Sequence, residues 1–476
     1  MFASLTAFVL LLTIAWLLMM FWLARRTLPP GLALQAPKRP AEDVRLLIDH
    51  TQVLGNGEQQ LSHTIFDQVM IHIAQAKRLV LVDMFLFNGS KADREDFRPL
   101  ASELTAALLA RKAEHPAMAI IVITDPINTL YGGSQHPQFE QLQAAGIAVV
   151  ETRLTALRDS NLAWAACWRP LISWLGNHSE RGWLPTGLGH QKVTLRSYLA
   201  LLNFKANHRK VLIADEGDSW RGLVSSGNPH DASSRHSNIA VSFTGPAVAD
   251  LLASERAVLA FSATTMSQAL PQLSEAPTHA QASDVQVQVL TEGAIRDALL
   301  EMIDSTPAGG ELDLLMFYLA HRRVIKALMA AHQRGVALRV ILDPNKDAFG
   351  YEKSGIPNRQ VAMELAQAGI PVRWYNTRGE QCHSKLLLRR VEGEPVQCLL
   401  GSANFTRRNL DNLNLETDVR LWLAGADPNA LALAGLMASC WDPAGSVTLP
   451  YPAYRDHSRL RYWRYRLMEI TGLSTF

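Results

Sequence analysis

Beyond residue 40, the chain alternates short, almost wholly apolar runs with longer segments in which apolar residues recur every three or four positions. The runs "LVLVDMFLF", "MAIIVITDP" and "AVVETRL" are typical of buried strands. Between them, "LTAALLARKA" and "FEQLQAAG" have helical spacing, and the second ends at Gly146, a residue suited to a helix C-cap. This order predicts an α/β fold in which helices flank a central mixed sheet.

The same order of elements returns in the second half of the chain. "LDLLMFYL" resembles "VDMFLF", and "CHSKLLLRR" resembles "NHRKVLIAD", and the two histidines are 175 residues apart. Because several matches occur in one order, we predict two copies of one α/β unit, at 40–262 and 285–445, packed around a pseudo-twofold axis. The Ala-, Ser-, Pro- and Gln-rich segment 263–284 is predicted to be a linker.

The N-terminal segment is of a different kind. Its 23 consecutive uncharged residues, "FASLTAFVLLLTIAWLLMMFWLA", are enough to cross a bilayer as a helix. Arg25 and Arg26 follow it, whereas a cleaved signal peptide has basic residues before the apolar segment and a small-residue cleavage site after it. We therefore predict that residues 1–30 form a retained transmembrane anchor, with a cleaved signal as the alternative. The two arginines favour a cytoplasmic position for the body.

Two further segments stand outside the repeat. Residues from about 156 to 203 form an insert in the first copy, which we interpret either as a membrane-contacting surface or lid, or as ordinary packing against the body. Residues 446–476 form a tail with five arginines among aromatic residues. The tail suits anionic lipid, nucleic acid, or a final helix with solvated arginines. The tryptophans of the insert are Trp164, Trp168, Trp174 and Trp183.

Charge and cysteine content narrow the function classes. A net charge of +2 provides no global field for nucleic acid, so no nucleic acid partner is expected. The sequence shows no convincing carboxylate or histidine cluster for a metal, and we expect neither a metal nor another cofactor. The four cysteines are scattered without a C-x-x-C pair, which predicts buried free thiols: Cys167, Cys382, Cys398 and Cys440.

Candidate chemistry lies at the start of one strand in each copy. Residues i and i+2 of a strand point to the same face, so His208 and Lys210 are predicted to lie side by side, as are His383 and Lys385. About 20 residues later, each copy has a small polar element that supplies a hydroxyl and an amide donor. These residues are Ser226, Asn228, Ser402 and Asn404.

Two such half-sites facing each other suit attack on a phosphodiester. An in-line displacement needs a nucleophile and a leaving-group acid on opposite sides of phosphorus, and two histidines related by a pseudo-twofold axis meet that need. The lysines and asparagines would stabilise charge on the non-bridging oxygens, as a metal ion does elsewhere. One H-x-K triplet occurs readily by chance, but two copies, each followed by Ser-x-Asn, indicate an active site.

The motif "HRKVLIAD", from His208 to Asp215, resembles the H-x-K-x4-D signature of the phospholipase D superfamily, and "GSANFTRRNLDNLNLE" resembles its downstream G-S-x-N motif. The resemblance covers both halves of the body. It implies a phosphohistidine intermediate and transfer to water or an alcohol, with His208 as nucleophile and His383 as general acid, then base. It also implies that the lysines and asparagines bind phosphoryl oxygens, supported by Ser226 and Ser402.

The first departure from that signature is Arg390, which takes the place of Asp215 in the second copy. Strand parity puts both positions on the face opposite the histidines. We therefore expect a structural role for this position and retained activity.

The second departure concerns the residue that orients each histidine. The second copy has Glu416 where the family often has a carboxylate, whereas the first copy has Ala240, with Asn238 nearby as a substitute. A carboxylate favours the charged imidazolium, so we expect Glu416 to support His383 as the acid.

The superfamily contains lipases, phosphatidyltransferases such as cardiolipin synthases, nucleases and toxins. The anchor and the tryptophan-rich insert favour a phospholipid substrate at a membrane. We therefore predict a phosphatidyltransferase or phospholipase D of the cell inner membrane, with its catalytic body on the cytoplasmic side. A cardiolipin synthase would transfer a phosphatidyl group from one phosphatidylglycerol to another. The alternatives are a membrane-anchored phosphodiesterase or nuclease and an inactive membrane scaffold.

Overall fold

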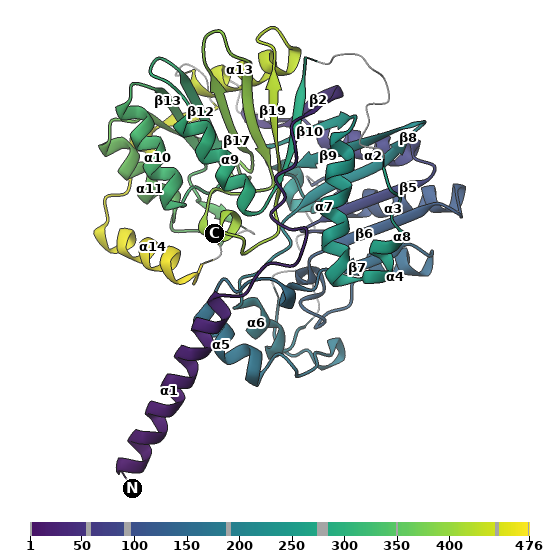
Figure 1. Cartoon of the computed structure of the whole chain (residues 1–476), viewed down its shortest axis with the longest axis vertical. Helices are drawn as coiled ribbons and strands as arrows, with labels where there is room; N and C mark the ends of the chain where they lie inside the picture. The colour runs from purple at the N-terminus through teal and green to yellow at the C-terminus, as the bar shows by residue number, and fades with distance from the viewer. Residues whose placement is uncertain are drawn as a thin grey trace.

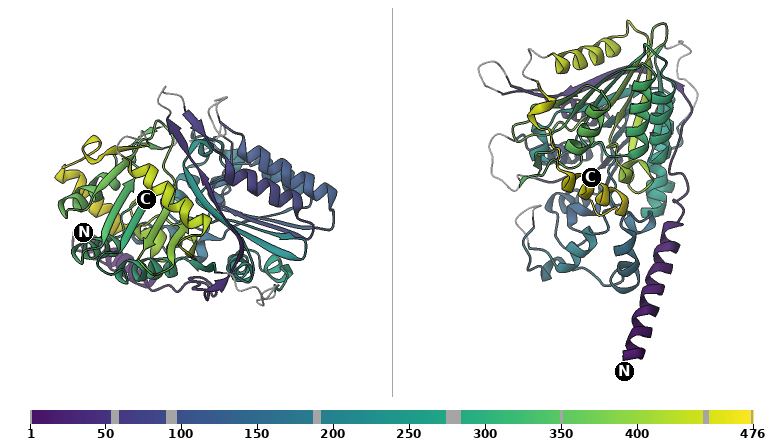
Figure 2. Two further views of the ribbon diagram at one scale, coloured as in Figure 1. Left: turned by 90° about the horizontal axis from the view of Figure 1, so that it is seen from above. Right: turned by 90° about the vertical axis from the view of Figure 1, so that its left-hand side faces the viewer.

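Two mixed β-sheets form the centre of the molecule, with helices around them (Figure 1). The computed structural model describes residues 2–53, 59–89, 97–186, 192–273, 284–348, 351–442, 447–474 and 476. Helix α1, Phe2–Ala24, projects away from this body (Figure 1, Figure 2). The predicted α/β fold with two central mixed sheets is confirmed.

The first sheet has seven strands in the order β2-β10-β9-β8-β5-β6-β7. β5, β6 and β7 are parallel to one another, and β8 runs antiparallel to β5. Parallel neighbours need a crossover connection, which explains why helical segments separate these strands in the sequence. The bounds are β2 Glu42–Asp49, β5 Leu79–Met84, β6 Ala119–Thr124, β7 Ala148–Glu151, β8 Lys210–Glu216, β9 Ser219–Ser225 and β10 Asn238–Thr244.

The second sheet has nine strands in the order β1-β11-β19-β18-β17-β12-β13-β16-β20. Its strands β19 to β16 repeat the order of β10 to β7, including the parallel pairs. The repeat in the sequence is therefore a repeat of sheet topology. The bounds are β1 Arg39–Pro40, β11 Gln286–Thr291, β12 Glu311–Met316, β13 Ala337–Leu342, β16 Val372–Tyr375, β17 Lys385–Arg390, β18 Val396–Gly401, β19 Thr417–Leu423 and β20 Thr448–Pro450.

The remaining elements surround the sheets. Two short hairpins pair β3 with β4 and β14 with β15: Thr51–Val53, Gln59–Leu61, Asp347–Ala348 and Tyr351–Glu352. The helices after α1 are α2 Thr64–Gln75, α3 Leu100–Glu114, α4 Pro137–Ala144, α5 Leu162–Leu171, α6 Leu195–Leu201, α7 Ala247–Ser262, α8 Thr264–Ala269, α9 Gly293–Asp304, α10 Arg322–Gln333, α11 Asn358–Gln367, α12 Arg407–Leu410, α13 Pro428–Trp441 and α14 Arg459–Thr471.

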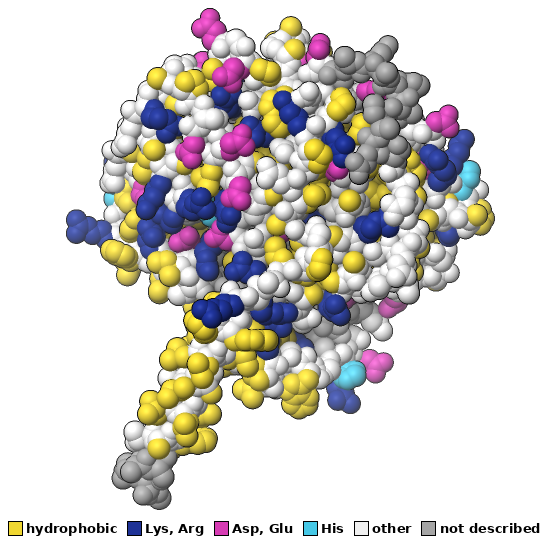
Figure 3. Space-filling view, viewed as in Figure 1, with side chains coloured by type: hydrophobic (Ala, Val, Ile, Leu, Met, Phe, Trp, Pro, Cys, Tyr) yellow, Lys and Arg dark blue, Asp and Glu magenta, His cyan; other side chains and the backbone are white. Residues whose placement is uncertain are grey.

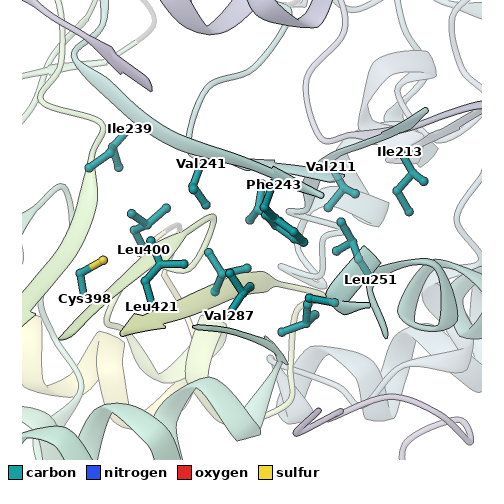
Figure 4. Packing of buried hydrophobic residues seen from close by; sticks show 14 of the residues in the cluster. Val211, Ile213, Ile239, Val241, Phe243, Leu251, Val287, Cys398, Leu400 and Leu421 are labelled. Atoms are coloured by element: carbon teal, nitrogen blue, oxygen red, sulfur yellow. The ribbon is translucent and has the colours of Figure 1, made fainter. Parts of the chain in front are cut away.

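The two sheets share one hydrophobic core. Figure 4 shows Val241 and Phe243 of β10 in the same cluster as Leu400 of β18 and Leu421 of β19, and all four are buried. The opposite faces of the sheets pack under other helices, α2 and α3 in the first half and α9 and α10 in the second. The two halves therefore form one body. Three of the four free cysteines belong to the shared core: Cys382, Cys398 and Cys440.

Segments at or beyond the edges of the two predicted units extend the second sheet. β1 pairs Arg39 with Val287, so the chain leaving α1 runs along the second sheet before it enters the first. β20, from the predicted tail, pairs antiparallel with β16. The start of the predicted linker forms α8, and Leu270 after it is buried. Residues 274–283 of that segment lie outside the described residues.

The insert between β7 and β8 packs against the end of α1. Trp16 Nε1 donates a hydrogen bond to the carbonyl of Ala163 in α5, at 3.0 Å. Arg26, just beyond α1, lies 3.8 Å from the buried carboxylate of Asp159, which also pairs with Lys205 at 2.6 Å. Helix α1 is long and apolar enough to cross a membrane, and only 6% of its most apolar window is buried.

Candidate active site

The two candidate histidines enter their strands at the seam between the halves. The backbone N–H of His208 donates to the carbonyl of Leu415 at 2.9 Å, and that of His383 donates to the carbonyl of Ser237 at 2.8 Å. The first bond is part of a parallel bridge that fixes the start of β8 against the segment entering β19. The second is part of a parallel bridge that fixes the start of β17 against the segment entering β10. The residue after each bridge therefore lies beside the histidine of the opposite half.

Glu416, which follows the first bridge, lies against His208. Its Oε2 is 3.0 Å from Nδ1 of His208 and accepts a hydrogen bond from Ser402 Oγ at 2.5 Å. Asn409 Nδ2 donates to the other carboxylate oxygen. The prediction that Glu416 orients His383 is therefore wrong, because the bridges exchange the histidine partners between the halves.

Asn238 takes the corresponding position beside His383. Its Oδ1 lies 3.1 Å from Nδ1 of His383 and accepts a hydrogen bond from Ser226 Oγ at 2.9 Å. The expectation that Ala240 is the counterpart of Glu416 is wrong, because the registers of β10 and β19 give that place to Asn238. Asn238, which the sequence suggested as a substitute, is thus an orienting residue. It orients His383 of the other half and not His208 of its own half.

Each histidine has a lysine two residues later and packs on a phenylalanine ring. Lys210 Nζ donates to the carbonyl of His208 at 2.6 Å, and Lys385 Nζ donates to that of His383 at 2.5 Å. The histidine and phenylalanine ring centroids are 4.8 and 4.9 Å apart in the two halves, and the ammonium groups lie 5.2 and 5.1 Å from the same rings. These rings are Phe85 and Phe317.

Burial disfavours the charged form of all four groups. It lowers the pKa of His208 to about 4, a shift that the Glu416 carboxylate opposes. Burial also lowers the pKa of His383 well below its usual value, and Lys385 adds to this effect. Burial lowers the pKa of Lys210 to about 7 and that of Lys385 well below its usual value, where Lys210 contributes further. A phosphate anion held among these groups would raise each pKa, so the site favours an anionic ligand.

Asn228 and Asn404 each follow, by two positions, the serine that holds a histidine partner. Both are buried. Asn228 Oδ1 accepts a hydrogen bond from the backbone N–H of Leu86 at 3.4 Å, whereas Asn404 Oδ1 has no partner among the described residues. The side-chain N–H groups of both asparagines can donate hydrogen bonds to a phosphoryl oxygen.

Asp215 lies at the other end of β8 from His208. Its carboxylate accepts hydrogen bonds of 2.8 to 3.1 Å from the backbone N–H groups of residues 77–79. Arg390 has the same place in β17 and pairs with Glu311 and Asp313 of β12, at 2.5 and 2.7 Å. Both residues connect a histidine strand to its neighbour, and neither contacts the histidine cluster.

The sequence did not reveal a buried ion network behind the site. Arg209 is fully buried and lies 3.0 Å from Glu255 and 2.7 Å from Glu292. Glu292 Oε1 also accepts a hydrogen bond from the backbone N–H of Glu416 at 3.1 Å. The network therefore connects the segment that carries His208 to the segment that carries its carboxylate partner. The only signal in the sequence was the arginine within H-R-K, which a strand directs to the opposite face.

Comparisons with known proteins agree with this geometry. Residues 299–427 match the family model of the cardiolipin synthase phospholipase D-like domain. No curated protein sequence matches the chain. The crystal structure of a phosphatidylserine synthase from Haemophilus influenzae Rd KW20 is similar over 92% of this chain and 97% of its own, with 11% identity and a TM-score of 0.59. The resemblance to the phospholipase D superfamily and its fold is thereby confirmed.

Two other solved structures show weaker similarity. Nuc from Salmonella typhimurium, a phospholipase D family member, has 23% identity over 36% of this chain and 99% of its own, with a TM-score of 0.29. A polyphosphate kinase from Porphyromonas gingivalis has 13% identity over 90% of this chain and 53% of its own, with a TM-score of 0.44.

Proposed function

We propose that the chain is a membrane-anchored enzyme that cleaves a phospholipid phosphodiester through a phosphohistidine and transfers the phosphatidyl group to water or to an alcohol. The observation that carries this proposal is the pair of His-Lys half-sites at the seam, in which each histidine is held through Nδ1 by the opposite half. An acceptor on Nδ1 selects the tautomer whose Nε2 has the free lone pair. Both rings thus have a nitrogen available for reaction.

His208 is the proposed nucleophile. Its Nε2 lone pair attacks phosphorus and forms the P–N bond while the bond from phosphorus to the leaving oxygen breaks. His383, protonated on Nε2 when the anionic substrate is bound, gives that proton to the leaving oxygen. Lys210 and Lys385 stabilise the non-bridging oxygens.

The second step uses the same groups in reverse. His383, now neutral, takes the proton from the O–H of water or of an acceptor alcohol. The acceptor oxygen attacks phosphorus, the P–N bond breaks, and His208 regains its lone pair. Asn228 and Asn404 donate to the phosphoryl oxygens in both steps, and the serine before each asparagine keeps a histidine partner in position.

The surroundings of the site favour a lipid substrate. Helix α1 would anchor the body in the bilayer, and the insert that packs against it exposes Trp174 and Trp183, at 71% and 64%. The other two tryptophans of the insert pack against each other, with ring centroids 6.1 Å apart. Exposed tryptophan beside a membrane span is typical of the interfacial region. Arg25 and Arg26 place the body on the cytoplasmic side of the inner membrane in this proposal.

Within this class, synthesis of cardiolipin from two phosphatidylglycerol molecules is the first reaction to test. The family model matching residues 299–427 is named for cardiolipin synthase, and the similar solved structure is a phosphatidylserine synthase. Both names denote enzymes that form a phospholipid. In the proposed reaction, the acceptor alcohol is a hydroxyl of the second phosphatidylglycerol.

The test is to incubate membranes holding the full chain with labelled phosphatidylglycerol and to separate the products. Cardiolipin with released glycerol supports transfer to a lipid, and phosphatidic acid supports hydrolysis. Membranes with the His208→Ala variant are the control and should give neither. Oligonucleotide cleavage without lipid turnover would contradict the proposal and favour the alternative, an anchored nuclease.

A further inference from the structure

Helix α14 has its apolar side turned outward. Leu460, Trp463, Leu467 and Ile470 recur at helical spacing and are exposed by 81%, 68%, 61% and 62%. The opposite side is fixed to the body: Tyr465 is fully buried, and its hydroxyl donates to the carbonyl of Ala320 at 3.2 Å. An amphipathic helix on a soluble body normally buries its apolar stripe. The contacts of Tyr465 therefore hold four large apolar side chains toward the outside.

Basic residues accompany this stripe. Arg459, Arg461 and Arg464 are exposed on α14, and Arg461 is paired with Asp456 at 2.9 Å. The one acidic residue of the helix, Glu469, is buried on the inner side. An exposed face that combines tryptophan and leucine with arginine matches the interfacial region of an anionic bilayer, where apolar side chains enter and cations meet headgroups.

The position of α14 agrees with this partner. The turn after it contacts the insert, since a Cβ on Gly472 would lie 2.1 Å from the carbonyl oxygen of Ser160. The insert in turn packs on α1. Figure 1 shows α14, α5 and α6 around the end of α1 where it meets the body, and Figure 3 shows hydrophobic side chains along α1 and over the adjoining part of the molecule.

We propose that α14 is a docking helix that lies in the headgroup region of the anionic membrane that α1 crosses. The inference rests on the membrane anchoring proposed above but not on the catalytic reaction. Docking α14 would fix the tilt of the body about α1. It would also hold the active site against lipid, because residues after α14 reach the second half-site: the Phe476 ring lies 6.3 Å from that of Tyr318, next to Phe317, which packs on His383.

The experiment places a fluorescent probe on the full chain. Leu467→Cys is labelled with a polarity-sensitive dye after Cys167→Ser, since the other three native cysteines are buried. The matched control is Leu431→Cys, 59% exposed on α13 at the far end of the body (Figure 1). Both proteins are reconstituted in vesicles of phosphatidylcholine with phosphatidylglycerol, and quenching by brominated lipid is compared with quenching by aqueous iodide.

We expect lipid quenching at position 467 to exceed that at 431 at least about three-fold, with the reverse order for iodide. The lipid quenching at 467 should fall in vesicles of phosphatidylcholine alone, and also with Arg459→Glu and Arg464→Glu. The equilibrium constant for docking should fall on the order of five-fold for each arginine contact that is lost. The His208→Ala variant should behave as the parent, which separates docking from catalysis.

The opposite results overturn the inference in distinguishable ways. If the protein floats with the vesicles while the probe at 467 remains open to iodide, α14 does not dock, although α1 is inserted. If the protein does not float, the anchor and the docking helix both fail. If lipid quenching is equal with and without phosphatidylglycerol, the arginines have no role in docking.

Discussion

In the first half-site, the acceptor on Nδ1 of His208 is the carboxylate of Glu416; in the second, the acceptor on Nδ1 of His383 is the amide oxygen of Asn238. The distances are nearly equal, 3.0 and 3.1 Å, and the flanking lysine, phenylalanine and serine are the same in both. The difference is therefore one of charge, not of shape.

In the proposed reaction, this difference gives two similar rings different roles. A nucleophilic imidazole becomes positively charged when Nε2 bonds to phosphorus, and the Glu416 carboxylate stabilises that charge. An amide cannot do so to the same degree, so protonated His383 is the stronger acid and gives up its proton more readily. The roles proposed for the two histidines thus follow from their partners, although Glu416 supports the nucleophile instead of the acid.

Removal of either imidazole is expected to have the largest effect. His208→Ala should reduce turnover by about 10⁴-fold or more and abolish the phosphoenzyme, because no nucleophile remains. His383→Ala should still form a phosphoenzyme from a p-nitrophenyl phosphodiester, because that leaving group needs no acid. Denaturation in alkaline detergent, in which the P–N bond is stable, followed by detection of ³²P-labelled protein measures both. A phosphoenzyme in His208→Ala and none in His383→Ala would reverse the assignment.

Exchanging the charge of the partners is the next test. Glu416→Gln should lower kcat by about 10³-fold, because the imidazole loses the carboxylate that stabilises its positive charge. Asn238→Asp should change kcat by less than about 10-fold, because His383 keeps an acceptor on Nδ1. Steady-state rates on phosphatidylglycerol vesicles give the comparison. Equal losses of kcat in the two variants would show that the charge difference between Glu416 and Asn238 does not give the two histidines different roles.

The same two variants should also differ in the pH dependence of kcat/KM. His208 must be neutral to attack, and its pKa is about 4, lowered by burial and raised in part by Glu416. Removing the carboxylate in Glu416→Gln lowers this pKa further, so the acid limb of kcat/KM should move to lower pH. Asn238→Asp adds a negative charge beside His383, which raises its pKa and should move the basic limb to higher pH by about one unit. An unchanged pH profile in Glu416→Gln would contradict the contact of Glu416 with His208. An unchanged pH profile in Asn238→Asp would contradict the contact of Asn238 with His383.

The smallest effects are expected at the far ends of the histidine strands. Asp215→Ala leaves three backbone N–H groups without their acceptor, so the free energy of unfolding should fall by about 1–3 kcal/mol. Arg390→Ala should cost about 0–1 kcal/mol, because Arg339 still pairs with Asp313. Thermal unfolding in detergent measures both. Activity should stay within a few-fold of the parent, and a loss on the scale of His208→Ala would contradict the structural role of these positions.

The sequence was sufficient for the parts of the site that depend on local order. The strands that carry His208 and His383 are predicted by their apolar runs, and the structure places a lysine two residues after each histidine as strand alternation requires. The repeated phenylalanine in "MFLF" and "MFYL" was also visible in the sequence.

Histidine partners were not predictable in the same way. Glu416 and His208 are 208 residues apart, and their contact depends on how the halves dock, which no local pattern encodes. Equal spacing from Asn228 and Asn404 points to Ala240 as the counterpart of Glu416, but the first copy has a loop two residues shorter. Spacing within a strand is fixed by geometry, whereas loop length varies freely between repeats.

The exchange of histidine partners at the seam determines when the site is completed during synthesis of the chain. When only the first sheet has emerged from the ribosome, the chain contains His208 and Lys210 but not Glu416. The proposed nucleophile then has no carboxylate at its Nδ1. The proposed catalytic pair of His208 and Glu416 is completed only when β19 has been synthesised, long after α1 has emerged and could reach the membrane. The chain would therefore meet its membrane before it can act on lipid, and residues 1–283 and 284–476 produced as separate chains should be active only when they reassociate.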